Sequence, residues 1–135
     1  MIVLYDADCG FCRWAMAWAV RHDRHHVLVA VPIQSPLGSE LLVDVVPSER
    51  LRSAHLITDD GRRHSGGAAT ADVLAVLPRT RAVGRLARNL PAITAMLYRV
   101  IAARRRSLGR LVGDEAGRRA DELLKATTAS TSAEL

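Results

Sequence analysis

The feature that most constrains this chain is its only pair of cysteines, Cys9 and Cys12, which have two residues between them. The apolar run 1–5 precedes them and indicates a buried strand. The segment 11–21 has apolar residues at helical spacing and contains no Gly or Pro. The pair therefore falls at a strand-to-helix junction, with Cys9 at the helix start and Cys12 about one turn further in. This placement is typical of sites for thiol–disulfide exchange.

The helix start supplies a physical reason for this chemistry. Its unpaired backbone N–H groups and aligned peptide dipoles favour negative charge, and hence a thiolate over a thiol. Because the thiolate is the attacking species, we expect Cys9 to be the nucleophile. Cys12 would then attack the mixed disulfide and release the reduced partner. Gly10 and Phe11 form the spacer that lets the two sulfurs meet, and they tune the reduction potential in a direction that the sequence does not give.

Two other uses of the cysteines are weaker alternatives. A closed zinc site needs four ligands, and the chain has no second cysteine pair, so zinc would depend on its five histidines. A purely structural disulfide would gain little from closing so short a loop. A redox role is therefore favoured over both.

Length and composition set the domain organisation. With 135 residues we expect a single domain over 1–125, with a core of about 1–78 and added helices over about 79–125. The segment 126–135 is rich in Ser, Thr and Ala and predicts a flexible tail.

Charge and hydropathy limit the partners. The net charge is +5, but only one of the 19 basic residues is lysine, a bias that suggests a GC-rich genome more than phosphate binding. Aromatic residues make up 4%, too few for a base-stacking surface, so we do not expect nucleic acid as a partner. No run approaches the ~18 apolar residues of a membrane span. The chain begins with a strand and no charged leader, so the cytoplasm is the expected compartment.

The order of predicted elements gives the fold class. A second strand is expected at 27–31, a helix from Ser35 that ends at Pro47, a hairpin with strands at 53–58 and 62–65, and a helix over 70–77. The order β-α-β-α-β-β-α indicates an α/β fold with a thioredoxin/glutaredoxin-like core and a C-terminal helical extension. Two further apolar stripes, over 83–90 and 93–101, predict helices packed against the sheet or the other helices.

Five residues near the cysteines could support the site. Asp8 is a candidate helix cap, and Asp6 is a turn residue or a proton acceptor for Cys12. Tyr5 is expected in the core with its hydroxyl near the site. Arg13 could attract anionic substrates or lie solvated. Gly67, in a predicted Gly66–Gly67 loop, could bring backbone close to the disulfide.

The segment 5–12 resembles the signature of the DCC family of predicted thiol–disulfide oxidoreductases, which is named for an aspartate and two cysteines. The segment 32–38, Asp60-Gly61, Pro91, Tyr98 and 103–106 resemble further family blocks, so the resemblance covers about residues 1–110. Family members commonly have the triplet Asn-Arg-Tyr near this C-terminal block. This chain has three arginines there, at 104–106, so only Arg105 matches the triplet. Ser53 stands where thioredoxins place a cis-proline that faces the disulfide.

The resemblance implies a thioredoxin-like enzyme that exchanges a Cys9–Cys12 dithiol or disulfide with protein or small-thiol substrates. No metal and no cofactor beyond the redox-active disulfide are expected, with glutathione a candidate co-substrate. Two alternatives stay open: a non-catalytic binding module and a zinc-binding or redox-sensing protein. The binding module would bind a peripheral anionic partner with its arginine-rich helices. The arginines concerned are Arg79, Arg81, Arg85, Arg88, Arg99 and 104–106.

Overall fold

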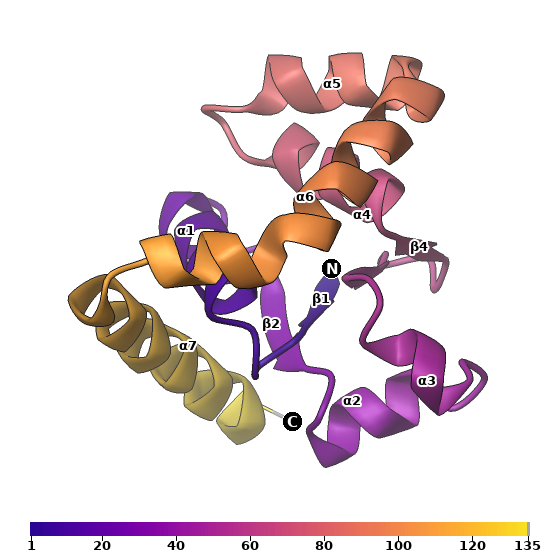
Figure 1. The fold of residues 1–135 in the computed structure, drawn as a ribbon. Coiled ribbons are helices and arrows are strands. Elements are labelled where there is room, and N and C mark those ends of the chain that lie inside the picture. The colour runs from indigo at the N-terminus through magenta and orange to yellow at the C-terminus, as the bar shows by residue number, and fades with distance from the viewer. Residues whose placement is uncertain (135) are drawn as a thin grey trace.

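A four-stranded mixed sheet lies within residues 1–134, the part of the chain that the computed structural model describes (Figure 1). The strand order is β2-β1-β3-β4, with β1 and β2 parallel and the other two pairs antiparallel. The strands are β1 (Ile2–Tyr5), β2 (Val29–Pro32), β3 (His55–Ile57) and β4 (Arg63–Ser65). The helices are α1 (Gly10–His22), α2 (Pro36–Leu41), α3 (Pro47–Arg50), α4 (Gly67–Val76), α5 (Arg81–Asn89), α6 (Pro91–Leu111) and α7 (Asp114–Glu134).

The predicted fold class is confirmed: this is a mixed α/β arrangement consistent with a thioredoxin-like fold, with added C-terminal helices. One expected element was wrong. The helix predicted from Ser35 to Pro47 ends at Leu41, and Pro47 begins the short helix α3. Proline suits a first helical position because the N–H that it lacks has no partner there. Gly67 is likewise the first residue of α4 rather than part of a loop.

The two faces of β1 enter two separate apolar cores, because successive side chains of a strand point to opposite faces. Val3 and Tyr5 lie in the larger core, which contains residues of α1, α4 and α7. Leu4 is fully buried on the other face with Val31 and Leu42. This double burial fixes β1, and with it the loop that leads into α1.

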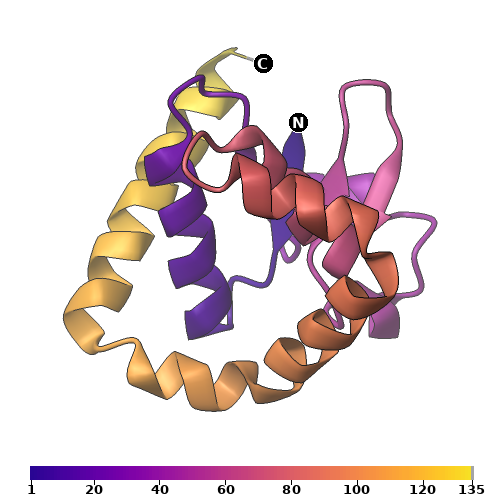
Figure 2. The same ribbon diagram turned by 90° about the horizontal axis from the view of Figure 1, so that it is seen from above.

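Helix α7 is part of the larger core rather than an addition to it. Ala120 and Leu124 are buried in that core, and Figures 1 and 2 show α7 alongside α1. The segment 126–134, expected as a tail, forms the last turns of α7, and residue 135 lies outside the described residues. Within 1–134, no helix has the length and hydropathy to cross a bilayer.

Helices α5 and α6 form as predicted, but the prediction that their large apolar residues pack inward was wrong. Leu86 is 60% exposed and Met96 is 58% exposed, and their neighbours on these stripes are also exposed. The inward face of α6 instead carries small residues such as Ala95, together with Tyr98. A Cβ at Gly67 would lie 3.2 Å from the Cα of Ala95, so α4 and α6 approach each other closely. Helix α6 passes across the start of α1 (Figure 2). The large apolar residues of its stripe stay exposed.

Candidate active site

Cys9 caps the N-terminus of α1 with its own sulfur. Its backbone is extended, with φ −95° and ψ 112°, and its Sγ accepts a hydrogen bond of 3.3 Å from the backbone N–H of Cys12. Gly10 is the first residue of the helix. The expected location of both cysteines is thus what the structure shows, and both thiols are free. The expectation that Asp8 caps the helix was wrong, because the Cys9 sulfur occupies that role.

Cys12 is half-buried and lies on the first turn of α1. Burial raises the pKa of its thiol to about 12, with smaller contributions from a side-chain hydrogen bond with Cys9 and from the charge of Cys9. The nearby Arg105 guanidinium acts in the opposite direction. A thiol of this kind stays protonated at neutral pH, so it suits the second step of an exchange better than the first.

The loop before Cys9 is held by Gln34, a residue that the sequence reasoning did not single out. The Gln34 amide donates to the carboxylates of Asp6, at 2.7 Å, and Asp8, at 3.3 Å. Its carbonyl oxygen accepts from the backbone N–H of Ala7 at 3.1 Å. Asp6 also accepts from the N–H of Asp8 at 3.0 Å, as in an Asx turn. Asp6 therefore acts in the turn, and Asp8 is an exposed partner of Gln34.

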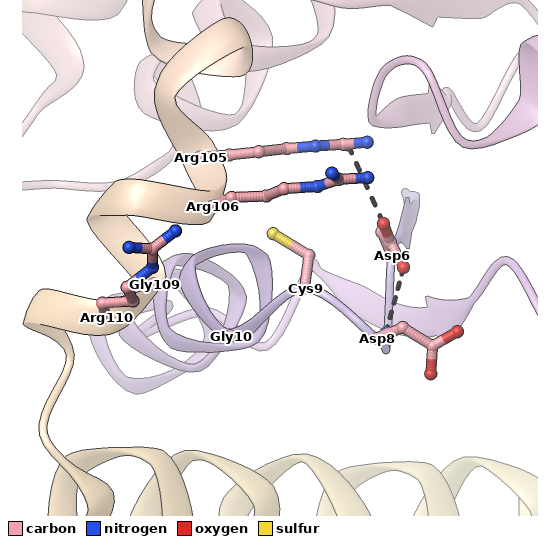
Figure 3. Close-up of a pocket in the computed structure, with 8 residues that line it drawn as sticks. All are labelled: Asp6, Asp8, Cys9, Gly10, Arg105, Arg106, Gly109 and Arg110. Atoms are coloured by element: carbon pink, nitrogen blue, oxygen red, sulfur yellow. Dashed lines mark hydrogen bonds and ion pairs between the residues drawn. The ribbon is translucent and has the colours of Figure 1, made fainter.

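Three arginines of α6 lie beside Cys9, although about 100 residues of chain separate them from it. Figure 3 shows the side chains of Arg105 and Arg106 extending from α6 toward Asp6, with the Cys9 sulfur pointing toward the helix. Arg105 lies 3.8 Å from Asp6 and donates to the backbone carbonyl of Leu51 at 3.0 Å. The resemblance carried over Arg105 alone, and nothing in the sequence pattern predicted Arg106 or Arg110 at this site.

These side chains enclose a cavity of about 360 Å³ that opens onto Cys9. It is lined by Asp6, Asp8, Cys9, Gly10, Arg105, Arg106, Gly109 and Arg110 (Figure 3). The absence of a side chain at Gly109 favours the close approach of α6, since a Cβ there would lie 3.3 Å from the backbone nitrogen of Phe11. The Cys9 thiol therefore meets a small, cationic cavity.

A second cavity, of about 280 Å³, borders Cys12 on the inner side of α1. Ser53, which stands at the usual cis-proline position, lines this cavity together with Tyr98 of α6. The described residues contain no cis peptide bond. The Tyr98 hydroxyl accepts from the backbone N–H of Ala54 at 2.9 Å, which ties α6 to the segment before β3. The two cysteines thus face different cavities.

The remaining candidate residues lie either at the cavity beside Cys12 or away from both cavities. Tyr5 is buried and lines the cavity at Cys12, and burial raises the pKa of its hydroxyl. Phe11 lines the same cavity. Arg13 pairs with Asp121 of α7 at 3.2 Å, so it connects two helices rather than facing a substrate. Gly67 packs against α6 rather than approaching the cysteines.

Chemically, the arrangement offers one thiol at a helix terminus and, one turn away, a second thiol whose pKa is raised by burial. Within 1–134, no group of three or more His, Cys, Asp or Glu side chains is placed to hold a metal ion. What the geometry provides is a dithiol whose two sulfurs have different surroundings, as sequential exchange requires.

Comparison with known proteins identifies the family. A family model described as DCC1-like thiol-disulfide oxidoreductase matches residues 3–111, which include both cysteines, Gln34 and the arginines of α6. No curated protein and no solved structure matches the chain. Since the match spans most of the sequence, the chain belongs to the DCC1-like thiol-disulfide oxidoreductase family.

Proposed function

We propose that this protein is a thiol–disulfide oxidoreductase in which Cys9 attacks the substrate disulfide and Cys12 resolves the intermediate. The observation that carries this proposal is the asymmetry between the two thiols. Cys9 caps α1 with its sulfur and lines the cavity beside the arginines of α6, whereas Cys12 lies one turn further in and lines the separate cavity on the inner side of α1. Burial raises the pKa of the Cys12 thiol to about 12. Family membership supports a redox role of this kind.

The reaction runs in two balanced steps. The Cys9 thiolate attacks one sulfur of a disulfide R–S–S–R, which forms a Cys9–S–S–R bond and releases one thiolate R–S⁻. Cys12 then loses its proton and attacks the Cys9 sulfur, which forms the Cys9–Cys12 disulfide and releases the second thiolate. The dithiol loses two electrons, and its two protons end on the released thiols. The reverse sequence oxidises a dithiol substrate.

On the basis of the same chemistry, we propose that the protein acts in the cytoplasm. A dithiol that reduces disulfides works where reducing systems restore it, and the cytoplasm is such a place. Protein or small-molecule disulfides are both compatible with family membership.

Single cysteine variants test the assignment of roles. Serine is a good helix cap, so Cys9→Ser keeps an acceptor for the N–H of Cys12 and should preserve the start of α1. After incubation with 2-hydroxyethyl disulfide, mass spectrometry should show one stable mixed disulfide on Cys12→Ser. The wild type should show an internal disulfide, and Cys9→Ser should stay almost unmodified. Equal modification of Cys9→Ser and Cys12→Ser would overturn the proposal.

A further inference from the structure

The cavity at Cys9 is lined by more positively charged side chains than carboxylates. Three guanidinium groups line it, together with the carboxylates of Asp6 and Asp8. Arg105 is occupied, since it binds the Leu51 carbonyl and lies 3.8 Å from Asp6. Asp8 accepts from Gln34 and points away from the Cys9 sulfur in Figure 3.

The other two arginines of the cavity, Arg106 and Arg110, are unpaired in the described part of the chain. Both are exposed residues of α6, and within 1–134 neither has a hydrogen-bond or ion-pair partner in the protein. Other exposed arginines of α6, such as Arg99 and Arg104, also lack a partner among the described residues, but they do not line the cavity at Cys9. Two unpaired guanidinium groups at the rim of a cavity that contains a reactive thiol are placed to bind an anion there.

We propose that the disulfide substrate of Cys9 is a small molecule that carries carboxylate groups, and that Arg106 and Arg110 bind these groups. This inference rests on the proposed function. A guanidinium group matches a carboxylate with two parallel N–H donors. The volume of about 360 Å³ lies at the low end of small-molecule sites, which favours a small disulfide over an extended protein segment.

The arginines have a positioning role in the exchange. Binding the carboxylates places one substrate sulfur near Cys9, where attack forms the Cys9–S–S–R bond and releases the other half as its thiolate. The departing thiolate is also anionic, so the same positive field stabilises it as the bond breaks. No oxidant or reductant beyond the substrate disulfide and the protein dithiol is required.

The test compares two probes on the reduced full-length protein. One is 3,3′-dithiodipropionate, which carries two carboxylates, and the other is 2-hydroxyethyl disulfide, which is neutral. The measured quantity is the ratio of their rates of reaction with Cys9, because the ratio cancels any change in the reactivity of the thiol itself. In Arg106→Gln/Arg110→Gln this ratio should fall about tenfold relative to wild type. In wild type it should also fall as salt is added.

Arg99→Gln is the control matched to each single variant, Arg106→Gln or Arg110→Gln, because it also removes one positive charge, but from an exposed position of α6 outside the cavity. Its ratio should stay within about twofold of wild type, since screening limits the reach of an exposed charge to ~10 Å. If the double variant does not fold, the single variants Arg106→Gln and Arg110→Gln, both at exposed positions, should each lower the ratio about threefold.

The outcomes separate this inference from the function on which it rests. An unchanged ratio in the arginine variants, or an equal fall in Arg99→Gln, overturns the inference while Cys9 still reacts. Failure of wild-type Cys9 to react with either probe overturns the proposed function instead.

Discussion

The backbone N–H of Cys12 donates a hydrogen bond to the sulfur of Cys9 over 3.3 Å. The sulfur thus takes the place that a Ser, Thr or Asp oxygen usually has at a helix N-terminus. One contact therefore starts α1 and fixes the position of the sulfur that we propose as the nucleophile. It also places the two cysteines within one helical turn, as the resolving step requires.

The burial of Cys12 predicts a distinctive pH dependence of its reactivity. In Cys9→Ser, the rate of alkylation of Cys12 by iodoacetamide should rise about tenfold per pH unit from about pH 7 to 10 without reaching a plateau. The reason is that burial, the largest cause, raises the pKa of Cys12 to about 12, and this cause persists when Cys9 is replaced. An unfolded peptide with one cysteine should level off above about pH 9. A plateau at that pH in the folded variant would show that Cys12 is not buried as described.

Replacement by alanine should have opposite effects on stability at two helical glycines, Gly84 and Gly117. A Cβ at Gly84 in α5 would lie 2.2 Å from the backbone nitrogen of Ala75 in α4, so Gly84→Ala must separate the helices. We expect it to lower the free energy of unfolding by about 1–3 kcal/mol. Gly117 in α7 has nothing within 4 Å of an added Cβ, so Gly117→Ala should raise stability by about 0.5–1 kcal/mol. Urea denaturation measures both, and equal effects would contradict the close packing of α4 and α5.

His55 predicts a loss of stability in weak acid. Its Nε2 donates to the carbonyl of Arg50, and its Nδ1 accepts from the hydroxyl of Ser65, so the neutral ring is fully bonded. Burial lowers the pKa of His55 below the ordinary value of 6.5. The unfolded chain therefore binds a proton at His55 more tightly than the folded chain does. The stabilisation that neutral His55 gives to the folded state is complete above pH 6.5. It is lost as the pH falls below 6.5, by at most about 1.4 kcal/mol per pH unit.

The variant His55→Gln isolates this contribution from that of the other histidines. Denaturation midpoints measured from about pH 7.5 to 5 should fall less steeply in His55→Gln than in wild type. The variant should be less stable at the upper end of this range because it loses the bonds to Arg50 and Ser65. Parallel pH profiles would mean that protonation of His55 does not oppose folding.

The sequence predicted the parts of the site that depend on local patterns. The apolar run of β1, the helical spacing of α1 and the cysteines between them are close in the chain, so their order alone placed Cys9 at the helix start. Assembly over long separations was not predictable in this way. Nothing near Arg106 or Arg110 in the chain shows that α6 crosses the start of α1, because that contact joins distant segments, with Gly109 close to the backbone of Phe11.

The orientation of α6 shows a second limit of sequence patterns. Helical periodicity correctly located its apolar stripe, but it did not show which face would turn inward. Small side chains such as Ala95 allow the helix backbone to approach α4 closely, and the bulky residues, such as Met96 and Ile101, remain at the surface. Gln34 was missed for a related reason, since its three hydrogen bonds all reach residues in 6–8, about 28 positions earlier in the chain.

The central claim is that Cys9 and Cys12 form a reversible redox pair, and a redox titration tests it most directly. Purified protein is equilibrated in buffers of graded glutathione potential, free thiols are alkylated and counted by mass, and zinc is assayed on the same sample. We expect both thiols to disappear together in one reversible two-electron transition in zinc-free protein. Thiols that stay free at every potential, that oxidise only between molecules, or that are held by stoichiometric zinc would contradict the claim.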